Sequence, residues 1–319
     1  MSSIKEANYK NYIKIARFDH WIKQLFILPG FFLAYILVGT TETTLNIAIT
    51  VFLGLLATSA AASANYCINE WLDAGFDKYH PVKKNRPFVT GKLKPAIVIA
   101  EYSFFSIISL CIAYFISPEV LLSIGVFLLM GILYNVRPVR TKDLPYIDIL
   151  SESLNNAIRL IIGWFCITVI VLPPVSIVFG YWMGGAFLMA AKRFAEYRMI
   201  GDPEQAKLYR KSFGRYSELS LLLSTVFYGF LSIFFCGIYL IKHRIELLLF
   251  IPFLCGLFCY YLGICFKTDS AAQKPEKLYR EKGLLLYTAF LFVLFIALHF
   301  INIPMLESLL DVNLIRWEK

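Results

Sequence analysis

The sequence predicts an all-α integral membrane protein, a bundle of about nine transmembrane helices, on three observations. Apolar residues make up 58% of the chain, aromatic residues 16%, and the mean hydropathy is +0.64, well above the range of soluble globular domains. Apolar runs long enough to cross a bilayer recur along the whole chain. The polar stretches between these runs are too short to bury a core of their own. We therefore expect one membrane domain over residues 1–319.

The predicted spans follow the apolar runs in chain order, each of roughly 17 to 25 residues. They lie at residues 22–39, 46–66, 96–116, 119–135, 150–171, 174–191, 218–241, 246–266 and 283–302. The fifth span is polar at its start, and only VLPPVS at residues 171–176 separates it from the sixth; the two prolines should end a helix there. Residues 303–319 are expected to form an amphipathic segment on the membrane surface.

The distribution of Lys and Arg predicts which helix ends face the cytoplasm. If residues 1–23 are cytoplasmic, the segments on that side (1–23, 67–95, 136–149, 192–217 and 267–282) hold 26 of the 31 Lys and Arg residues. We therefore expect a multi-pass protein of the cell membrane, the inner or plasma membrane, with its N-terminus in the cytoplasm. This topology and anionic lipid explain the net charge of +9, so no nucleic-acid partner is expected.

A dense polar stretch follows the second span. Asn65, Asn69, Asp73 and Asp77 recur every four residues, so they share one helix face if the helix continues past the membrane. Glu70 lies three residues before Asp73, and like charges at this spacing repel one another. A divalent cation would remove that repulsion, and oxygen ligands with open coordination positions suit Mg²⁺ bound together with substrate phosphates. The stretch therefore predicts a magnesium site.

Basic residues follow this stretch without an intervening acid, among them Lys83 and Arg86. Acids followed by bases are typical of a site in which Mg²⁺ holds one phosphate group and Lys or Arg holds another. The alternative is a solvated helix end with balanced charges, since a cytoplasmic loop carries bases in any case.

A second set of polar residues falls in the fifth predicted span. Asp148, Glu152, Asn155 and Arg159 occupy one helical face. Charges are costly in a membrane-embedded segment, so this face should line a hydrated cavity. The alternative is an internal Glu–Arg pair that serves only structure.

These residues resemble the motifs of a known family. NEWLDAGFD at residues 69–77, followed by HPVKKNRP, is similar to the first aspartate-rich motif of the UbiA superfamily of intramembrane transferases, with Glu70 where aspartate is usual. Within that superfamily, the stretch is most similar to the polyprenyl-phosphate phosphoribosyltransferases.

Further segments carry the same resemblance, which spans residues 17–216. RFDHWIKQLFILP at residues 17–29 is similar to the R-x-x-Q-W-x-K-N segment of the phosphoribosyl branch and retains Trp21 and Lys23. Residues 134–164 resemble the second motif of the superfamily, and AAKRFAEYRMIGD and YRKSFGRY resemble two later segments of the phosphoribosyl branch. The matched positions are Tyr134, Lys142, Asp148, Arg159 and Gly163 in the second motif, and Lys192, Arg193, Glu196, Arg210, Phe213 and Tyr216 in the later segments.

The resemblance implies nine transmembrane helices around a central cavity that opens to the cytoplasm. It implies transfer of the 5-phosphoribosyl group from phosphoribosyl diphosphate (PRPP) to a polyprenyl phosphate lipid, with Mg²⁺ as cofactor and release of diphosphate. The metal ligands would be Asn69, Glu70, Asp73 and Asp77. The expected catalytic residues are Asn69, Asp73, Asp77, Lys23, Lys142 and Arg159, and the expected substrate-binding residues are Lys83, Arg86, Tyr134, Asp148, Lys192, Arg193 and Glu196.

Two other functions stay open at this point. A prenyltransferase of the same superfamily, which moves an isoprenoid from its diphosphate to an aromatic ring, would need the same Mg²⁺ site and a second acidic motif, which Asp148 and Glu152 partly match. A transporter or channel would explain polar residues that face a cavity, but not acids clustered at one membrane face. The sequence leaves open whether the chain forms homo-oligomers.

Overall fold

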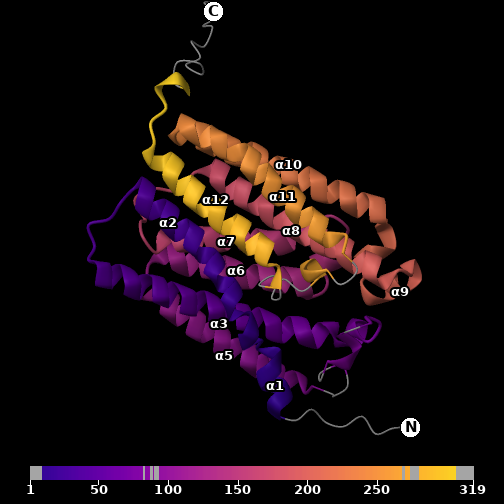
Figure 1. Cartoon of the computed structure of the whole chain (residues 1–319). Helices are drawn as coiled ribbons and strands as arrows, with labels where there is room; N and C mark the ends of the chain where they lie inside the picture. Colours follow the sequence, from indigo (N-terminus) through magenta and orange to yellow (C-terminus); the bar gives the residue numbers. More distant parts are fainter. Residues whose placement is uncertain are drawn as a thin grey trace, which may run out of the picture.

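The structure is a computed structural model that describes residues 9–81, 83–86, 89, 93–267, 270–273 and 280–306. Within these residues all regular structure is helical, and no strand occurs, so the predicted all-α fold class is confirmed. The long helices lie side by side with their axes in similar directions (Figure 1).

The helices follow one another along the chain with short connections. Their bounds are α1 Tyr9–Ile15, η1 Phe18–Ile27, α2 Leu28–Leu37, α3 Thr44–Asp77, η2 Lys83–Asn85, α5 Pro95–Tyr114, α6 Pro118–Asn135, η3 Thr141–Asp143, α7 Ile147–Phe165, α8 Val175–Ile200, α9 Pro203–Tyr209, η4 Lys211–Arg215, α10 Glu218–His243, η5 Ile245–Phe250, α11 Ile251–Cys265, η6 Ala271–Gln273 and α12 Lys282–Phe300.

Local sequence signals fix where several of these helices begin. The Thr43 side chain accepts a hydrogen bond from the Asn46 backbone N–H at the start of α3, and Ser117 does the same for Val120 at the start of α6. Ser217 and Ser220 form a capping box at the start of α10. Each cap satisfies backbone donors that the first helical turn leaves unpaired.

Eight helical segments of the described chain are long and apolar enough to cross a membrane, which supports a multi-pass membrane protein. The fifth predicted span, observed as α7, is not among the eight because it carries Asp148, Glu152 and Arg159. It nevertheless packs against α2, α6 and α8. The two prolines do separate it from α8, which starts at Val175 directly after Pro174.

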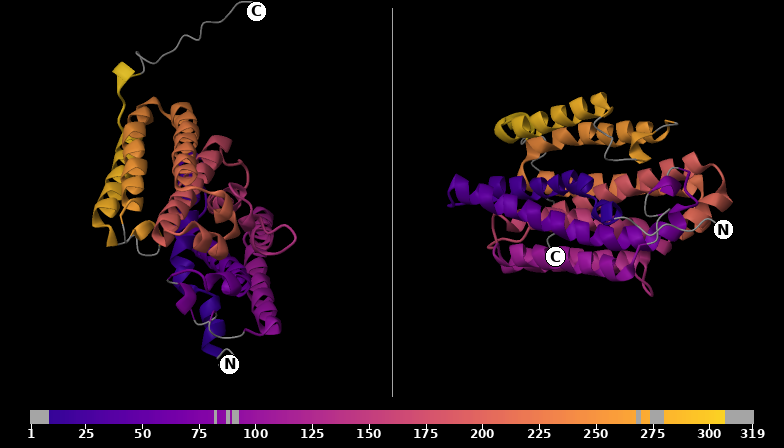
Figure 2. Two further views of the ribbon diagram at one scale, coloured as in Figure 1. Left: turned by 90° about the vertical axis from the view of Figure 1, so that its right-hand side faces the viewer. Right: turned by 90° about the horizontal axis from the view of Figure 1, so that it is seen from below.

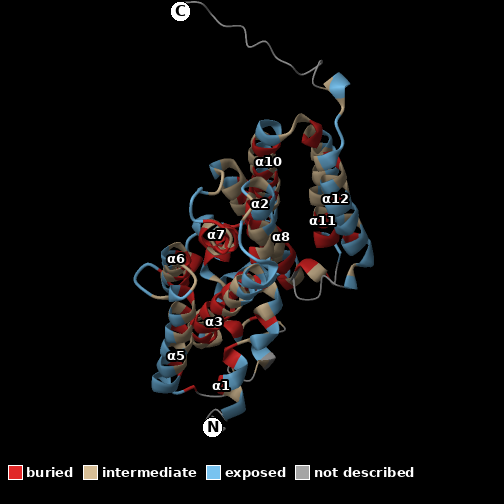
Figure 3. Ribbon diagram, turned by 90° about the vertical axis from the view of Figure 1, so that its left-hand side faces the viewer, coloured by how far each residue is buried: buried red, intermediate tan, exposed pale blue. Residues whose placement is uncertain are grey.

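Helix α3 is 34 residues long and continues well past its predicted span to Asp77. The acids predicted to share a helix face therefore do lie on one continuous helix. Buried residues are concentrated on α3 and α7 near the centre of the bundle, whereas α5 and α12 are largely exposed (Figure 3).

Helices α2 and α7 approach so closely that their backbones touch at two glycines. A Cβ atom on Gly30 would lie 1.9 Å from the carbonyl oxygen of Leu160, and a Cβ on Gly163 would lie 1.9 Å from that of Ile27. Any larger residue at either position would push the helices apart. This reciprocal contact fixes α7 against the N-terminal part of the chain.

Helices α11 and α12 form a pair at one edge of the bundle (Figure 2). The Tyr287 hydroxyl sits over Gly256, the Tyr260 hydroxyl sits over Gly283, and the two tyrosine rings stack 6.3 Å apart. Of the predicted amphipathic segment 303–319, residues 304–306 form one helical turn, and residues 307–319 lie outside the described part.

Candidate active site

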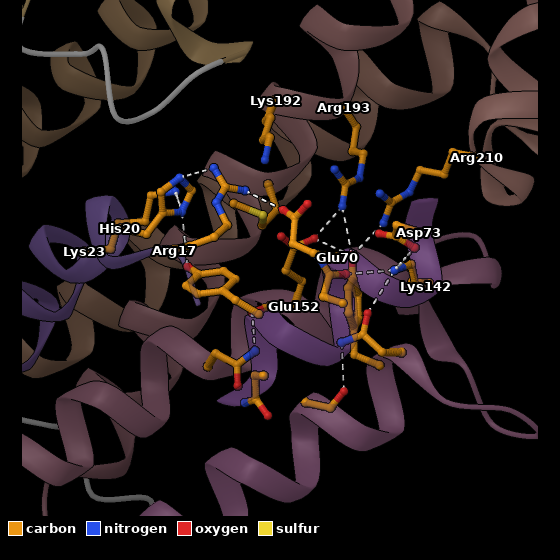
Figure 4. Close-up of a pocket in the computed structure, with 18 of the residues that line it drawn as sticks. Arg17, His20, Lys23, Glu70, Asp73, Lys142, Glu152, Lys192, Arg193 and Arg210 are labelled. Atoms are coloured by element: carbon orange, nitrogen blue, oxygen red, sulfur yellow. Dashed lines mark hydrogen bonds and ion pairs between the residues drawn. The ribbon is translucent and has the colours of Figure 1, made fainter. Parts of the chain in front are cut away.

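A cavity of about 790 Å³ lies among α3, α6, α7 and α8, at the end of the bundle where α3 terminates. All the predicted site residues except Asp148 line it: Lys23, Asn69, Glu70, Asp73, Asp77, Lys83, Arg86, Tyr134, Lys142, Arg159, Lys192, Arg193 and Glu196. Figure 4 shows basic and acidic side chains from several elements converging on it. The structure thus gathers residues up to 173 positions apart (23 to 196) into one site.

One wall of the cavity is the acidic stripe, Asn69, Asp73 and Asp77, on the last turns of α3. The Asp73 carboxylate receives Lys142 Nζ at 2.5 Å and an Arg140 nitrogen at 3.1 Å, yet its side chain is 21% exposed. Asp77 is buried and pairs with Arg86 at 3.0 Å. Asp73 is therefore the carboxylate of the stripe that a ligand reaches most directly.

Glu70 lies beside the stripe and is almost completely buried. One of its oxygens accepts from Arg17 at 2.9 Å, and the carboxylate also receives Arg86 at 3.1 Å. Arg86 therefore bridges Glu70 and Asp77. Both arginines come from segments outside α3, and their charge offsets part of the cost of burying this carboxylate.

Lys142 is the basic residue most tightly associated with the stripe. Its Nζ donates to Asn69 Oδ1 and to Asn135 Oδ1, each at 2.9 Å, in addition to the Asp73 contact. Burial lowers the pKa of Lys142 to about 8, although the Asp73 carboxylate opposes the shift. The amine therefore loses its proton at a lower pH than an exposed lysine does.

The second acidic pair, Asp148 and Glu152 on α7, is neutralised by two arginines. Arg193 contacts Asp148 at 3.5 Å and also binds Glu152. Arg210 approaches Asp148 at 3.4 Å. Asp148 also accepts hydrogen bonds from the hydroxyl groups of Ser212 and Tyr216 and is fully buried.

Asp148, which the sequence predicted as a substrate-binding residue, lies outside the cavity lining. Its four partners instead make it an anchor for Arg193 and Arg210. Arg193 is itself only 2% exposed and shares its guanidinium with Tyr134 and Glu196 as well. Arg193 and Arg210 are therefore better placed to hold the cavity wall together than to bind a phosphate directly.

Lys83 lies in the loop that follows α3, and its side chain extends across the cavity to the wall formed by α8. Its Nζ lies 2.9 Å from a Glu196 oxygen and also bonds the hydroxyl of Tyr209. Although burial opposes it, the Glu196 carboxylate holds the pKa of Lys83 above its ordinary value. Lys83 is therefore a cation that ties this loop to α8.

Arg159 and Lys192 line the cavity and make no ion pair with a carboxylate of the described residues. Arg159 donates to the neutral amides of Gln24 at 2.8 Å and Asn156 at 3.1 Å, and it lies over the Phe127 ring. The Lys192 side chain makes no ion pair or hydrogen bond with any residue of the described chain, and Figure 4 shows its amine directed into the cavity. A half-buried cation that makes no ion pair is an attractive site for an anionic ligand.

Sequence reasoning missed several residues that build this site, notably Arg17, Arg140, Asn135 and Tyr209. Arg17 and Arg140 both adopt left-handed backbone conformations, with φ of 50° and 27°, in the turns that bring them to the acids of α3. Such strain in residues other than glycine is common at functional sites. Nothing local in the sequence signals either conformation.

The oxygen donors of the stripe suit Mg²⁺ in chemistry, and Asp73 is open to the cavity. Among the described residues, however, no three acidic, His or Cys side chains already converge as a metal site. The carboxylates are directed instead to different cations, Arg86 for Asp77 and Lys142 for Asp73. Metal binding here would therefore require these basic partners to shift.

Comparison with known proteins identifies the fold and its family. The sequence model of the UbiA prenyltransferase family matches residues 26–294, most of the chain. The chain belongs to this family. A solved structure of a UbiA homologue from Archaeoglobus fulgidus bound to GPP and Mg²⁺ is similar with a TM-score of 0.66 and 19% identity, and covers 89% of this chain and 99% of that one.

Two kinds of relative are similar in sequence. The decaprenyl-phosphate phosphoribosyltransferase of Mycolicibacterium smegmatis is 26% identical over 206 residues, which cover 65% of this chain and 62% of the relative. The protoheme IX farnesyltransferase of Bacillus mycoides is 31% identical over 144 residues, or 43% of this chain and 46% of the relative. The protein is therefore a multi-pass membrane protein of the UbiA family, and the two relatives are named for transfer of different groups, phosphoribosyl and farnesyl.

Proposed function

We propose that the protein transfers the 5-phosphoribosyl group of PRPP to a polyprenyl phosphate and releases diphosphate. The observation that carries this proposal is the number of cations around the cavity, including Arg159 and Lys192, which have no carboxylate in contact. The donor brings a diphosphate and a 5-phosphate, and the acceptor brings another phosphate. A prenyl diphosphate brings only one such group and would leave more of this charge unused.

The reaction breaks the bond between ribose C1 and the diphosphate oxygen and forms a bond from C1 to an oxygen of the lipid phosphate. Because the acceptor is already an anion, no strong general base is needed, and alignment of the two substrates is the main requirement. Lys23 and Arg159 would hold the acceptor phosphate, and Lys192, Lys142 and Arg86 the phosphates of the donor. Tyr134 and Glu196 would fix the arginine and lysine partners that they contact.

Asn69, Asp73 and Asp77, with Glu70, would hold Mg²⁺, which when bound neutralises charge on the departing diphosphate. Lys142 would contribute positive charge at the same place through its contact with Asp73. Arg86 and Lys142 would exchange their carboxylate partners for phosphate oxygens as the substrate enters.

Prenyl transfer is the second candidate, supported by the likeness to farnesyltransferases. Prenyl transfer would use Asp148 and Glu152 as a second acidic motif. These two carboxylates are instead engaged in ion pairs with Arg193 and Arg210, so this reaction agrees less well with the site. For either reaction we propose a site at the cytoplasmic face of the cell membrane, where the positive-inside rule places the loops rich in Lys and Arg.

Membranes that contain the protein should incorporate ribose phosphate from labelled PRPP into organic-extractable lipid when a polyprenyl phosphate is supplied. Lys192→Gln should raise the apparent KM for PRPP roughly tenfold or more, because one charged contact to phosphate is lost. Lys207→Gln, in α9 outside the cavity, is the matched control. If the wild type labels no lipid but prenylates an aromatic acceptor from a prenyl diphosphate, the proposal is wrong.

A further inference from the structure

One histidine of the cavity has no part in the reaction proposed above. His20, on η1, is 4% exposed and lines the cavity beside Arg17 and Lys23 (Figure 4). Lys23 Nζ lies 2.9 Å from the Nδ1 atom of His20, and Arg17 Nη2 contacts the Nε2 atom. Both ring nitrogens therefore face side chains that can only donate hydrogen bonds.

This arrangement holds one donor too many. A neutral imidazole carries one N–H group and one lone pair, so it can accept a hydrogen bond from only one of the two cations. Whichever nitrogen carries the proton, its N–H group points at Arg17 or at Lys23. A second proton on the ring would add a third positive charge to this pair, so the ring is neutral in this arrangement.

The other groups around the His20 ring do not remove this excess of donors. Asp19 lies 3.5 Å from Nε2, but its side chain is 69% exposed and can be solvated by water. The Tyr66 hydroxyl of α3 makes only a long contact of 3.4 Å to Nδ1. Lys192 of α8 and Arg86 of the loop after α3 add further positive charge around the ring. The group that this cluster lacks is an anion.

Neighbouring side chains on η1 indicate which anion fits. Ile22 and Phe26 flank Lys23, line the cavity and are 62% and 43% exposed, so they suit a hydrocarbon chain. The Arg17 side chain is 19% exposed and Lys23 is half-buried, so a ligand in the cavity can reach both cations. A charged group beside an apolar surface matches the phosphate of a lipid better than that of a soluble sugar.

We propose that Arg17 and Lys23 bind the phosphate of the lipid acceptor, and that His20 takes up a proton from the solvent when this phosphate binds. The phosphate oxygens accept from both cations, so the lone pair of the ring is released. The negative charge of the phosphate then stabilises a proton on that second nitrogen. This inference rests on the proposed function, which supplies the lipid phosphate. His20 stands where the R-x-x-Q-W-x-K-N segment has Gln, a side chain that cannot be protonated.

Proton uptake is measured by calorimetry on the purified protein near pH 7, in two buffers of different ionisation enthalpy. The ligands are farnesyl phosphate and ribose 5-phosphate, which carry the same titrating phosphate monoester on a lipid and on a sugar. We expect farnesyl phosphate to bring roughly 0.5 to 1 proton more into its complex than ribose 5-phosphate does. Equal uptake with the two ligands, or no binding of farnesyl phosphate, overturns the proposal, and this arm needs no variant.

The variant His20→Gln assigns the proton. It should lose the additional uptake with farnesyl phosphate and should bind ribose 5-phosphate as the wild type does, which also shows that it is folded. His243→Gln, an exposed histidine at the end of α10, should keep the additional uptake. If His20→Gln keeps it as well, another group takes the proton and the proposal is wrong.

The pH dependence of binding follows from the same proton. Because the wild-type complex holds the additional proton, its affinity for farnesyl phosphate should fall as pH rises, and more steeply than the affinity of His20→Gln. Parallel pH profiles of the two proteins would contradict the role of His20. A steeper wild-type profile with ribose 5-phosphate alone would place the phosphate of the donor here and would overturn the assignment to the acceptor.

Transfer of labelled ribose phosphate from PRPP to lipid is measured in parallel, so that the two proposals can fail separately. Proton uptake that depends on His20 without transfer would keep the phosphate subsite and contradict the proposed reaction. Transfer without this uptake would keep the reaction and contradict the role of His20.

Discussion

The acidic stripe of α3 lines the cavity, whereas the acidic pair of α7 lies partly behind its wall, and the two groups of acids are neutralised in different ways. The stripe and Glu70 receive Arg17, Arg86, Arg140 and Lys142, which all come from turns and connecting segments. The pair on α7 forms ion pairs with Arg193 from within α8 and with Arg210 from the connection just before η4. Hydroxyl groups donate the remaining hydrogen bonds to Asp148. Counter-ions on connecting segments can yield to a ligand, whereas Arg193, which lies within the packed helix α8, cannot do so without disrupting the fold.

The largest effect should come from breaking the α7 pair. Arg193→Met leaves Asp148, Glu152 and Glu196 with less charge compensation in a buried site and should cost about 3 to 5 kcal/mol of stability. Thermal unfolding in detergent measures it. Arg198→Met, on the same helix but in an exposed pair with Glu218, should change stability by about 1 kcal/mol or less. Similar losses in both variants would contradict the comparison.

The next effect should appear in turnover and not in stability. Asp73→Asn keeps the shape of the most accessible member of the stripe but removes its charge, and should lower the rate of transfer roughly 10²- to 10³-fold. Initial rates at saturating Mg²⁺ and PRPP measure the loss, with the unfolding temperature as a control. Glu42→Gln, an exposed acid just before α3, should leave the rate unchanged. A fully active Asp73→Asn protein would remove this carboxylate from the site.

The smallest expected effect is a shift in the pH at which Lys142 loses its proton, which tests whether this amine interacts with Asp73 of the stripe. Burial lowers the pKa of this amine from 10.5 to about 8, so it is charged below that pH and loses its proton as pH rises. In metal-free protein, acylation of Lys142 followed by mass spectrometry should therefore rise with a midpoint near pH 8. Because Asp73 opposes the shift, Asp73→Asn should move that midpoint lower still. A midpoint like that of exposed Lys207 would show that Lys142 is not buried.

The parts of this molecule that the sequence predicted are those with local causes. The apolar runs defined most of the helices, and the four-residue recurrence of Asn69, Asp73 and Asp77 placed them on one face of α3. The proline pair correctly placed the start of α8, although α7 ends at Phe165, before the prolines and short of its predicted end at residue 171. In each case the information lies within a few turns of the residue concerned.

The parts that escaped prediction depend on contacts between distant segments. Arg17 meets Glu70 across 53 positions and Arg140 meets Asp73 across 67. No local pattern encodes these pairings, and the strained turns that create them have no glycine to mark them. The burial of Asp148 behind the cavity wall likewise depends on Arg193, Arg210 and Tyr216, which arrive from later segments. The motif therefore identified Asp148, but the ion pairs that bury it could not be read from the sequence around it.

The glycine contact between α2 and α7 bears on how the protein is made. Helix α7 carries three charged residues and is a poor candidate to enter a bilayer by itself, because each charge at membrane depth costs several kcal/mol. When α7 leaves the ribosome, α2 has already been synthesised, and Gly30 offers a smooth surface on which Gly163 can seat. We therefore expect α7 to insert into the bilayer while it packs against α2, which is already in place. The order of synthesis would thus lower the cost of inserting the charged helix on which the polar cavity depends.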